Sequence, residues 1–274
     1  MAGTSKLRAY GRLATFAVAS WIVVGGAWRA VFSRFPTRWA RSCAPVSGWS
    51  RLGARCLGIR PRVVGELPPP GSLVVANHQG YADVVTVGGL FPSIFAARHD
   101  MRTWPMFGAL ARHGATIFIN RDNKRAGYRG VGQVTAALVA GATVIAFPEG
   151  TSTDGRGLLP FRTGVFQSAV DARVPVVPAA VRYLDLDGEP VTDANRDVVG
   201  WFRGEPFVGH ILRLASHRRT LAEVAFGEPI RPPHADRRAL AAEAEARVRA
   251  LLAVAPGQVP FAVGRVLGPH QGGE

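Results

Sequence analysis

The stretch Leu73–Asp83, LVVANHQGYAD, joins an apolar run to a polar turn. The run Leu73–Ala76 is short, rich in valine and free of polar residues, which is typical of a strand buried on both faces of a parallel sheet. The chain turns polar at Asn77, and a helix-like stretch follows from Ala82 to Leu90. A strand that leads through a short turn into a helix predicts the first unit of an α/β fold.

The same alternation continues towards the C-terminus. Apolar, mostly β-branched runs predict further strands at Ile94–Ala97, Thr116–Ile119, Thr143–Phe147, Val174–Val181 and Glu223–Phe226. Helix-like stretches predict further helices at Trp104–Arg112, Arg125–Ala140, Thr163–Arg173 and Ala235–Leu252. Pro178 predicts a local irregularity in its strand, as in an edge or bulged strand. Together these patterns predict an α/β domain with a mostly parallel mixed sheet flanked by helices.

Charge divides the chain near residue 62. The 274 residues carry a formal net charge of +14, yet no Asp or Glu precedes Glu66. Lys6 and ten arginines, from Arg8 to Arg62, lie in this first part. Composition therefore predicts a basic, aromatic-rich helical segment at 1–62, an α/β domain at 63–256 and a C-terminal tail at 257–274.

The N-terminal segment mixes arginines and tryptophans with an uncharged run from Leu13 to Trp28. Tryptophan and arginine sit at the headgroup level of bilayers, so the mixture predicts binding to a membrane surface and no nucleic-acid partner. The run is shorter than the roughly 20 residues of a spanning helix. A helix dipping into one leaflet, a single span and a cleaved signal peptide all remain open. Residues 37–58 predict a second interfacial helix, and basic flanks favour the cytoplasmic face.

His78 and Asp83 are candidates for a general base and the carboxylate that orients it. Five positions along one regular helix would turn the two side chains about 140° apart. They can meet if His78 lies in the turn and Asp83 in the first turn of the helix. A carboxylate on one imidazole nitrogen fixes the tautomer and favours protonation of the other, which suits proton removal from a hydroxyl. A histidine that merely caps the helix is the alternative.

No motif for an enzyme nucleophile accompanies His78. The sequence contains neither G-x-S-x-G nor H-E-x-x-H, and Cys43 and Cys56 show no metal or disulfide spacing. We expect both cysteines to be free thiols and expect no metal or cofactor. If His78 is a base, the nucleophile is then the substrate's own hydroxyl, and no covalent enzyme intermediate forms.

Two further predicted strands end in polar residues. The stretch Gly114–Arg121, GATIFINR, delivers a guanidinium suited to phosphate or carboxylate. The stretch Phe147–Gly155, FPEGTSTDG, predicts an anion-friendly turn in which Glu149 could bind a substrate hydroxyl or orient a basic partner. Taken singly, a surface ion pair and a polar turn explain these two stretches at least as well.

The motifs N-H-x4-D, G-x4-I-x-R, F-P-E-G-T and V-P-V-V-P occur in this order along the chain. The set resembles the glycerolipid acyltransferase family that includes bacterial 1-acylglycerol-3-phosphate acyltransferase, over about residues 60–230. The resemblance implies an enzyme at the cytoplasmic face of the bacterial inner membrane, monotopic or with a single span. Its donor would be an acyl-acyl carrier protein or acyl-coenzyme A, and its acceptor the hydroxyl of a lysolipid.

The resemblance also implies roles for single residues. His78 would deprotonate the acceptor hydroxyl, and Asp83 would orient His78. The substrate's anionic head would lie in a pocket formed by Arg121, Glu149, Gly150, Thr151, Gly114 and Arg98. The sequence departs from the usual pattern at three places: Arg98 replaces a lysine, Gly80 stands where serine is common, and Asn120 stands where aspartate is frequent.

Two acceptors fit the motifs. The expected acceptor is 1-acyl-sn-glycerol-3-phosphate, which would give phosphatidate. The stretches 147–166 and 199–214 look similar to the branch that acylates lyso-ornithine lipid, so this lipid or another lysolipid is the alternative. A non-catalytic lipid-binding homologue is the alternative from another class, but the chain retains His78, Asp83, Arg121 and Glu149, which such a homologue need not keep.

Overall fold

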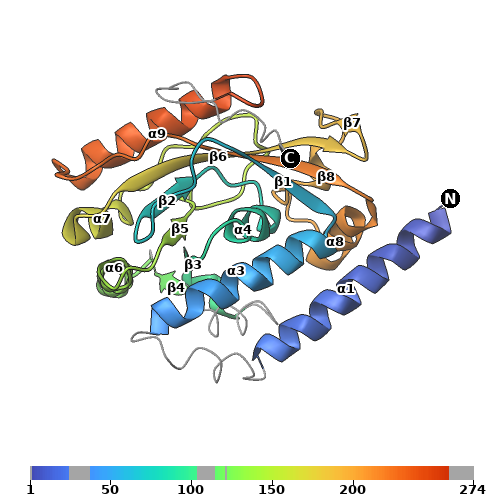
Figure 1. Ribbon diagram of the computed structural model, residues 1–274, viewed down its shortest axis with the longest axis horizontal. Helices are drawn as coiled ribbons and strands as arrows, with labels where there is room; N and C mark the ends of the chain where they lie inside the picture. The colour runs from blue at the N-terminus through green and yellow to red at the C-terminus, as the bar shows by residue number, and fades with distance from the viewer. Residues whose placement is uncertain (1, 25–37, 104–114, 121, 259–274) are drawn as a thin grey trace, which may run out of the picture.

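A computed structural model describes residues 2–24, 38–103, 115–120 and 122–258 (Figure 1). In this part of the chain one eight-stranded sheet has the order β1-β8-β6-β2-β5-β3-β4, with β7 paired to β6. The strands are β1 (Ile59–Val64), β2 (Leu73–Ala76), β3 (Ile94–Arg98), β4 (Ile117–Ile119), β5 (Val144–Ala146), β6 (Val176–Leu186), β7 (Glu189–Pro190) and β8 (Thr220–Phe226). Strands β6, β2, β5, β3 and β4 run parallel, and β8 is antiparallel to β6. The prediction of a mostly parallel mixed sheet is thus confirmed.

Helices cover both faces of the sheet. They are α1 (Ala2–Val24), α3 (Arg38–Cys56), α4 (Tyr81–Gly88), α6 (Lys124–Val139), α7 (Phe166–Ala172), α8 (Phe207–Ser216) and α9 (Arg237–Ala253), with short 3-10 turns η1 (His99–Thr103) and η2 (Arg196–Val198). Helices α6, α7 and α9 pack on one face, and α1, α3, α4 and α8 lie on the other (Figure 1). The predicted helix Trp104–Arg112 lies outside the described residues.

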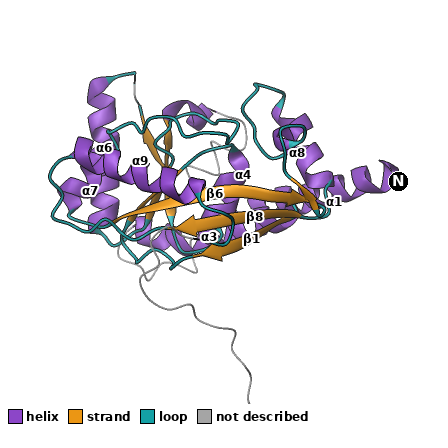
Figure 2. Cartoon of the chain, turned by 90° about the horizontal axis from the view of Figure 1, so that it is seen from above, coloured by secondary structure: helices purple, strands orange, loops and turns teal. Residues whose placement is uncertain are grey.

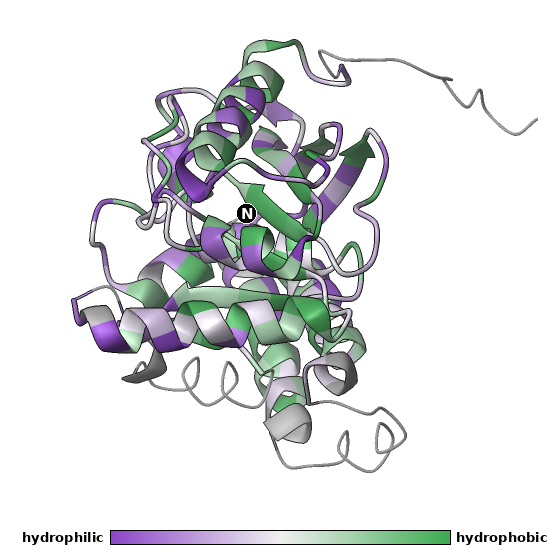
Figure 3. Ribbon diagram, turned by 90° about the vertical axis from the view of Figure 1, so that its left-hand side faces the viewer, coloured by the Kyte–Doolittle hydropathy of each residue, from purple (hydrophilic) through white to green (hydrophobic). Residues whose placement is uncertain are grey.

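Strand β2 shows why the run Leu73–Ala76 contains no polar residue. Leu73 and Val75 belong to the core shared with α6, α7 and α9, whereas Val74 and Ala76 belong to the core shared with α4 and α8. All four side chains have no exposed surface. Figure 3 shows the central strands mostly in the hydrophobic colour, as expected for a sheet covered on both faces.

Helix α1 is joined to the domain by packing and by charge. The ring of Phe16 lies 5.1 Å from that of Trp49 on α3, whose Nε1 donates to Ser20. At the far side, Arg12 donates to the carbonyls of Ala215 and His217 at the end of α8, at 3.1 and 2.6 Å. Cations suit helix C-termini because the unpaired carbonyls there carry partial negative charge. Helix α1 is therefore part of the folded body.

Strand β1 crosses the expected boundary between residues 62 and 63. It pairs with β8 from Ile59 opposite Thr220 to Val64 opposite Ala225, so the sheet begins before Arg62. A hydrophobicity pattern does not detect this strand, because it contains arginines at positions 60 and 62 and a proline at 61. An edge strand can carry them because one of its sides needs no strand partner.

Two more features differ from the sequence-based expectations. Helix α8 was not among the predicted helices, although Phe207, Ile211 and Leu214 have helical spacing. Pro178 also lies in a central strand: β6 sits between β2 and β8, and the register shift comes later, between Tyr183 and Asp185. Gly227 N donates to the Pro178 carbonyl one residue past the end of β8, so proline removes a single bond where the ladder stops.

The length and hydropathy of the helices bear on how the chain can meet a bilayer. Within residues 2–24, 38–103, 115–120 and 122–258, no helix is both long and apolar enough to cross a membrane.

Candidate active site

The motif residues follow the carboxyl ends of neighbouring parallel strands. Strand β2 leads into Asn77, β5 leads into Phe147, β3 ends at Arg98 and β4 leads into Asn120. Because these strands are parallel, their carboxyl ends meet at one edge of the sheet, where α/β proteins bind ligands. In Figure 2, which colours loops teal, loops run between α6 and α8.

His78 and Asp83 form the pair that their spacing predicts. His78 Nδ1 lies 2.9 Å from Asp83 Oδ2, with His78 in the turn after β2 and Asp83 in the first turn of α4. The main-chain amides of Gln79 and Gly80 donate to the same oxygen at 2.5 and 3.0 Å. The fully buried carboxylate therefore both caps α4 and orients the imidazole. His78 itself is not the helix cap.

The imidazole of His78 is fixed on one side and partly open on another. Its ring stacks on Phe147 with centroids 4.3 Å apart, and its side chain keeps 21% of its surface exposed. Since the Asp83 carboxylate accepts from Nδ1, that nitrogen carries the proton and Nε2 presents a lone pair. Within the described residues Nε2 has no hydrogen-bond partner. The arrangement can remove a proton from a hydroxyl placed against Nε2.

Glu149 orients the turn that carries His78. One carboxylate oxygen accepts from His78 N at 2.7 Å and the other from Leu159 N at 2.8 Å. The side chain is 3% exposed, and burial raises the pKa of Glu149. Glu149 was expected to bind a substrate hydroxyl or to orient a basic partner. In the structure both of its oxygens accept from main-chain amides, and one of these amides belongs to His78.

The rest of the loop Phe147–Gly155, here called the FPEGT loop, holds His78 from the other side. The amide and hydroxyl of Thr153 both donate to the His78 carbonyl, at 2.9 and 3.2 Å. Gly150 adopts a positive φ of 80°, which a glycine allows, and Thr151 is exposed. His78 is thus held through its amide, its carbonyl and its ring, which limits the positions that Nε2 can take.

The structure explains why glycine stands at position 80. Gly80 has a φ of 155°, and a Cβ atom there would lie 2.9 Å from the Trp201 amide nitrogen. That amide donates to the Gln79 carbonyl at 2.8 Å, and the Trp201 carbonyl accepts from Ser152 at 2.7 Å. Trp201 therefore bridges the turn at residues 77–80, here called the histidine turn, and the FPEGT loop. Its backbone leaves no room for a side chain at position 80.

We expect the substitution Gly80→Ser to destabilise the fold. Backbone strain and the contact with Trp201 should together lower the free energy of unfolding by about 2–4 kcal/mol. Thermal unfolding with Gly157→Ser as the control checks this, because Gly157 lies in the neighbouring loop and a Cβ added there would have no atom within 4 Å. Equal melting temperatures for the two variants would contradict the expectation.

Strand β6 holds the same turn through residues that sequence reasoning missed. Asn77 accepts from Val181 N at 2.7 Å and donates to Val181 O at 3.0 Å. The Tyr183 hydroxyl donates to Asp83 Oδ1 at 2.7 Å. The available signals were weak: an asparagine directly before the histidine, and a lone tyrosine in an apolar strand.

A second buried histidine supports the segment that carries Trp201. His210 on α8 accepts from the Tyr81 hydroxyl at 2.7 Å and contacts the Gly200 carbonyl at 3.1 Å. Burial lowers the pKa of His210, so it remains neutral near pH 7. This pair fixes α8 against α4 beside the histidine turn.

Three of the predicted anion-binding residues belong to the part of the chain around β3 and β4. Arg98 lies at the end of β3 and donates to Asp100 at 2.8 Å, a hydrogen bond that raises the pKa of its guanidinium. Gly114 and Arg121 lie outside the described residues. Their neighbour Asn120 follows β4, and its side-chain oxygen accepts from the amides of residues 122 and 123 at 2.9 and 3.2 Å.

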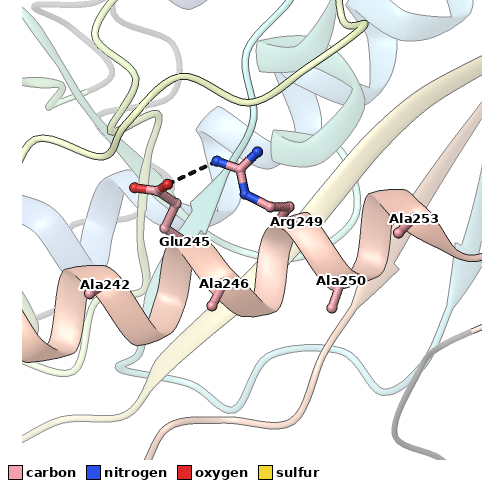
Figure 4. A pocket seen from close by; sticks show the side chains of 6 residues that line it. All are labelled: Ala242, Glu245, Ala246, Arg249, Ala250 and Ala253. Carbon is pink, nitrogen blue, oxygen red and sulfur yellow. Dashed lines mark hydrogen bonds and ion pairs between the residues drawn. The ribbon is translucent and has the colours of Figure 1, made fainter.

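A hollow of about 430 Å³ lies on α9, away from these motifs, and is lined by Ala242, Glu245, Ala246, Arg249, Ala250 and Ala253 (Figure 4). Glu245 pairs with Arg249 at 2.9 Å and accepts from Phe161 N at 2.8 Å. Arg249 also reaches the Leu158 carbonyl. We assign this hollow no part in the chemistry, because its polar groups anchor the loop that supports Glu149.

Known proteins resemble this chain over much of its length. A family model described as Acyltransferase matches residues 60–182. Lyso-ornithine lipid O-acyltransferases from Rhizobium meliloti and Pseudomonas aeruginosa are 32% and 34% identical to this chain. Those alignments cover 74% and 79% of this chain and 73% and 78% of the two relatives.

Two shorter or more distant similarities complete the comparison. A 1-acyl-sn-glycerol-3-phosphate acyltransferase from Neisseria gonorrhoeae is 35% identical over 52% of this chain and 56% of that relative. The crystal structure of the 1-acyl-sn-glycerophosphate acyltransferase PlsC from Thermotoga maritima matches with a TM-score of 0.62 and 19% identity, covering 89% of this chain and 95% of that one. The similarity of this chain to the Thermotoga maritima structure is one of fold alone. From the family match and the long alignments together, the chain belongs to the acyltransferase family and is an enzyme of that class.

Proposed function

We propose that this enzyme transfers an acyl chain from a thioester donor to the hydroxyl of a lysolipid, with His78 as general base. The observation that supports it most is the arrangement of the His78 ring. Nδ1 is bound to the buried Asp83 carboxylate, and the His78 side chain, which follows the carboxyl end of β2, keeps 21% of its surface exposed. A base needs this combination of a fixed tautomer and an accessible lone pair.

The proposed reaction balances without a covalent enzyme intermediate. His78 Nε2 takes the proton of the acceptor hydroxyl while the oxygen attacks the thioester carbonyl. The Asp83 carboxylate stabilises the imidazolium that forms. When the tetrahedral intermediate collapses, the C–S bond breaks and the imidazolium returns its proton to the leaving thiolate. The products are an ester and the free thiol of the donor.

Lyso-ornithine lipid is the acceptor that the comparisons favour. The relatives named for that lipid align over about three quarters of the chain, whereas the Neisseria glycerophosphate enzyme aligns over about half. The longer alignments must extend past the family match at 60–182. The part of the chain beyond that match includes the Trp201 segment and α8. Lysophosphatidate is the second candidate, supported by the Neisseria relative. Both acceptors carry an anionic group, a carboxylate in one and a phosphate in the other, which suits the proposed binding role of Arg121.

A direct assay separates the acceptors and the donors. The purified full chain would be supplied with lyso-ornithine lipid or lysophosphatidate, each with acyl-acyl carrier protein or acyl-coenzyme A, and the ester products separated by chromatography. We expect transfer to lyso-ornithine lipid to be fastest. Preference for lysophosphatidate would assign the enzyme to the other acceptor, and absence of transfer in all four combinations would refute the proposal.

We also propose that α1 lies on the membrane surface at the cytoplasmic face, without crossing the bilayer. Its buried side packs Ala9 and Phe16 on the domain, while Leu7, Tyr10 and Val18 on the opposite side are 75%, 60% and 61% exposed. These three residues lie at helical spacing on one face. An exposed apolar stripe on a basic segment suits anionic lipid headgroups with acyl chains beneath them.

The double substitution Leu7→Glu with Val18→Glu should therefore weaken binding to vesicles. Loss of two apolar side chains from the bilayer, together with two added negative charges, should reduce the bound fraction at least about tenfold. Sedimentation with vesicles of phosphatidylethanolamine and phosphatidylglycerol measures this. Val139→Glu is the matched control, because Val139 is 68% exposed on α6 across the sheet. Unchanged binding of the double variant would exclude α1 as the contact.

A further inference from the structure

Tyr183 touches the candidate active site from strand β6. Its hydroxyl donates to Asp83 Oδ1 at 2.7 Å, and both side chains are buried. A phenol hydroxyl in an apolar core needs a partner, but the partner here is the carboxylate that binds His78. Two hydrogen bonds, joined through the Asp83 carboxylate, thus connect the tyrosine to the imidazole.

Among the described residues, four donors reach Asp83, and they divide unequally between its two oxygens. Oδ2 accepts from His78 Nδ1 and from the amides of Gln79 and Gly80, whereas Oδ1 accepts from Tyr183. The three donors on Oδ2 all belong to the 78–83 turn. Tyr183 is the donor that comes from elsewhere in the chain, and it fixes the second oxygen and with it the plane of the carboxylate.

We infer that Tyr183 is a positioning residue for the proposed reaction: its hydroxyl orients Asp83 and reduces the negative charge available to His78, which sets the pH range in which His78 works as a base. The inference rests on the proposed function. The hydroxyl acts through Asp83 and does not touch the reacting atoms. Strand β6 supplies the fixed support, since Val181 also holds the Asn77 side chain.

Tyr183 remains a donor over the whole working pH range. Burial and the neighbouring Asp83 charge raise its pKa well above the usual value, so the phenol stays protonated. In the described part of the chain, the other ionisable groups around the pair are Glu149, which holds the His78 amide from the loop after β5, and Tyr81 on α4, which bonds to His210. Neither donates to the Asp83 carboxylate.

The substitution Tyr183→Phe removes the hydroxyl and keeps the ring. Without that donor the Asp83 charge attracts protonated His78 more strongly. The acidic limb of the kcat/KM profile should therefore move to higher pH by about 0.5–1 unit. Because more of the base is then protonated at neutral pH and Asp83 is less well held, kcat should fall about three- to tenfold near pH 7. The KM for the acceptor should not change.

The matched control is Tyr81→Phe, which removes another phenol hydroxyl, on α4, but keeps the four donors to Asp83 described above. A shift of the acidic limb in Tyr183→Phe alone supports the inference. No shift in that variant, or an equal shift in both, overturns it by showing a role in packing only. Replacing Tyr183 with 3-fluorotyrosine, a stronger donor of the same shape, should move the limb to lower pH and covers the case in which Tyr183→Phe folds poorly.

A measurement without substrate keeps this inference separate from the proposed function. The ring nitrogens of His78 can be followed by NMR in protein labelled with ¹⁵N-histidine, over a pH series, in the wild type and in both variants. The pH of the transition should rise in Tyr183→Phe and stay constant in Tyr81→Phe. If it does so while no acyl transfer is found, the proposed function fails and the coupling of Tyr183 to His78 stands; a constant transition in both overturns the coupling itself.

Discussion

The His78→Ala variant is expected to lose acyl transfer by at least about 10³-fold, with its fold and its vesicle binding retained. The large effect follows from the geometry: Nε2 is the group proposed to take the acceptor's proton, and Asp83 would be left facing a methyl group. The backbone bonds of His78 to Glu149 and Thr153 do not depend on its side chain. Initial rates with radiolabelled acyl donor, compared at equal protein concentration, measure the loss.

His217→Ala is the matched control for this variant. His217 also pairs with an aspartate, Asp187, at 3.2 Å, but on an exposed surface near the end of α8. Its carbonyl bond to Arg12 survives the substitution. Rates within about twofold of the wild type are expected there, since surface pairs contribute little. Near-normal transfer by His78→Ala would rule out the proposed base.

The Asp83→Asn variant should fold but transfer acyl groups about 10²–10³ times more slowly. An asparagine oxygen can accept the three donors now on Oδ2, and its NH₂ group can donate to Tyr183, whose oxygen also accepts. The shape of the site and the His78 tautomer are thereby kept. The negative charge is lost, so the imidazolium formed during proton removal is no longer stabilised.

Comparison of kcat with the melting temperature checks this prediction. Asp187→Asn, which neutralises the carboxylate of the exposed His217 pair, is the control and should keep its rate. A rate for Asp83→Asn close to that of the wild type would mean that Asp83 serves the turn alone. A variant that fails to fold would show that the charge holds the turn together, which contradicts the isosteric fit of asparagine at this position.

The part of the site that lies within one local unit was predictable from sequence. Strand β2 has the predicted bounds Leu73–Ala76, and His78 meets Asp83 as their five-residue spacing allows. Chain connectivity alone brings these groups together, because a strand, a tight turn and the first turn of a helix leave few arrangements. The order of alternating strands and helices likewise indicated the mostly parallel sheet.

The groups that come from distant parts of the chain were not predictable in the same way. Tyr183 lies 100 positions from Asp83, and nothing in the local pattern of β6 points to a carboxylate. The role of Glu149 stayed open until its two amide partners were known. The sequence shows only that Gly80 stands where serine is common. The structure gives the reason for the glycine: the Trp201 backbone lies too close for a side chain at position 80. Such contacts depend on which strands become neighbours in the sheet, and the spacing of residues along the sequence does not determine the order of the strands.

The bonds from α1 to the end of α8 have a consequence for the order of biosynthesis. Arg12 and the Ala215 carbonyl are 203 positions apart, so the first helix emerges long before its partner exists. At ordinary translation speeds this interval is roughly 10–40 s. Trp49 on α3 is available to Phe16 early, but the side of α1 that meets α8 has no protein to pack against during that time. If α1 binds the membrane surface as proposed above, the growing chain would reach the membrane first and complete its sheet there.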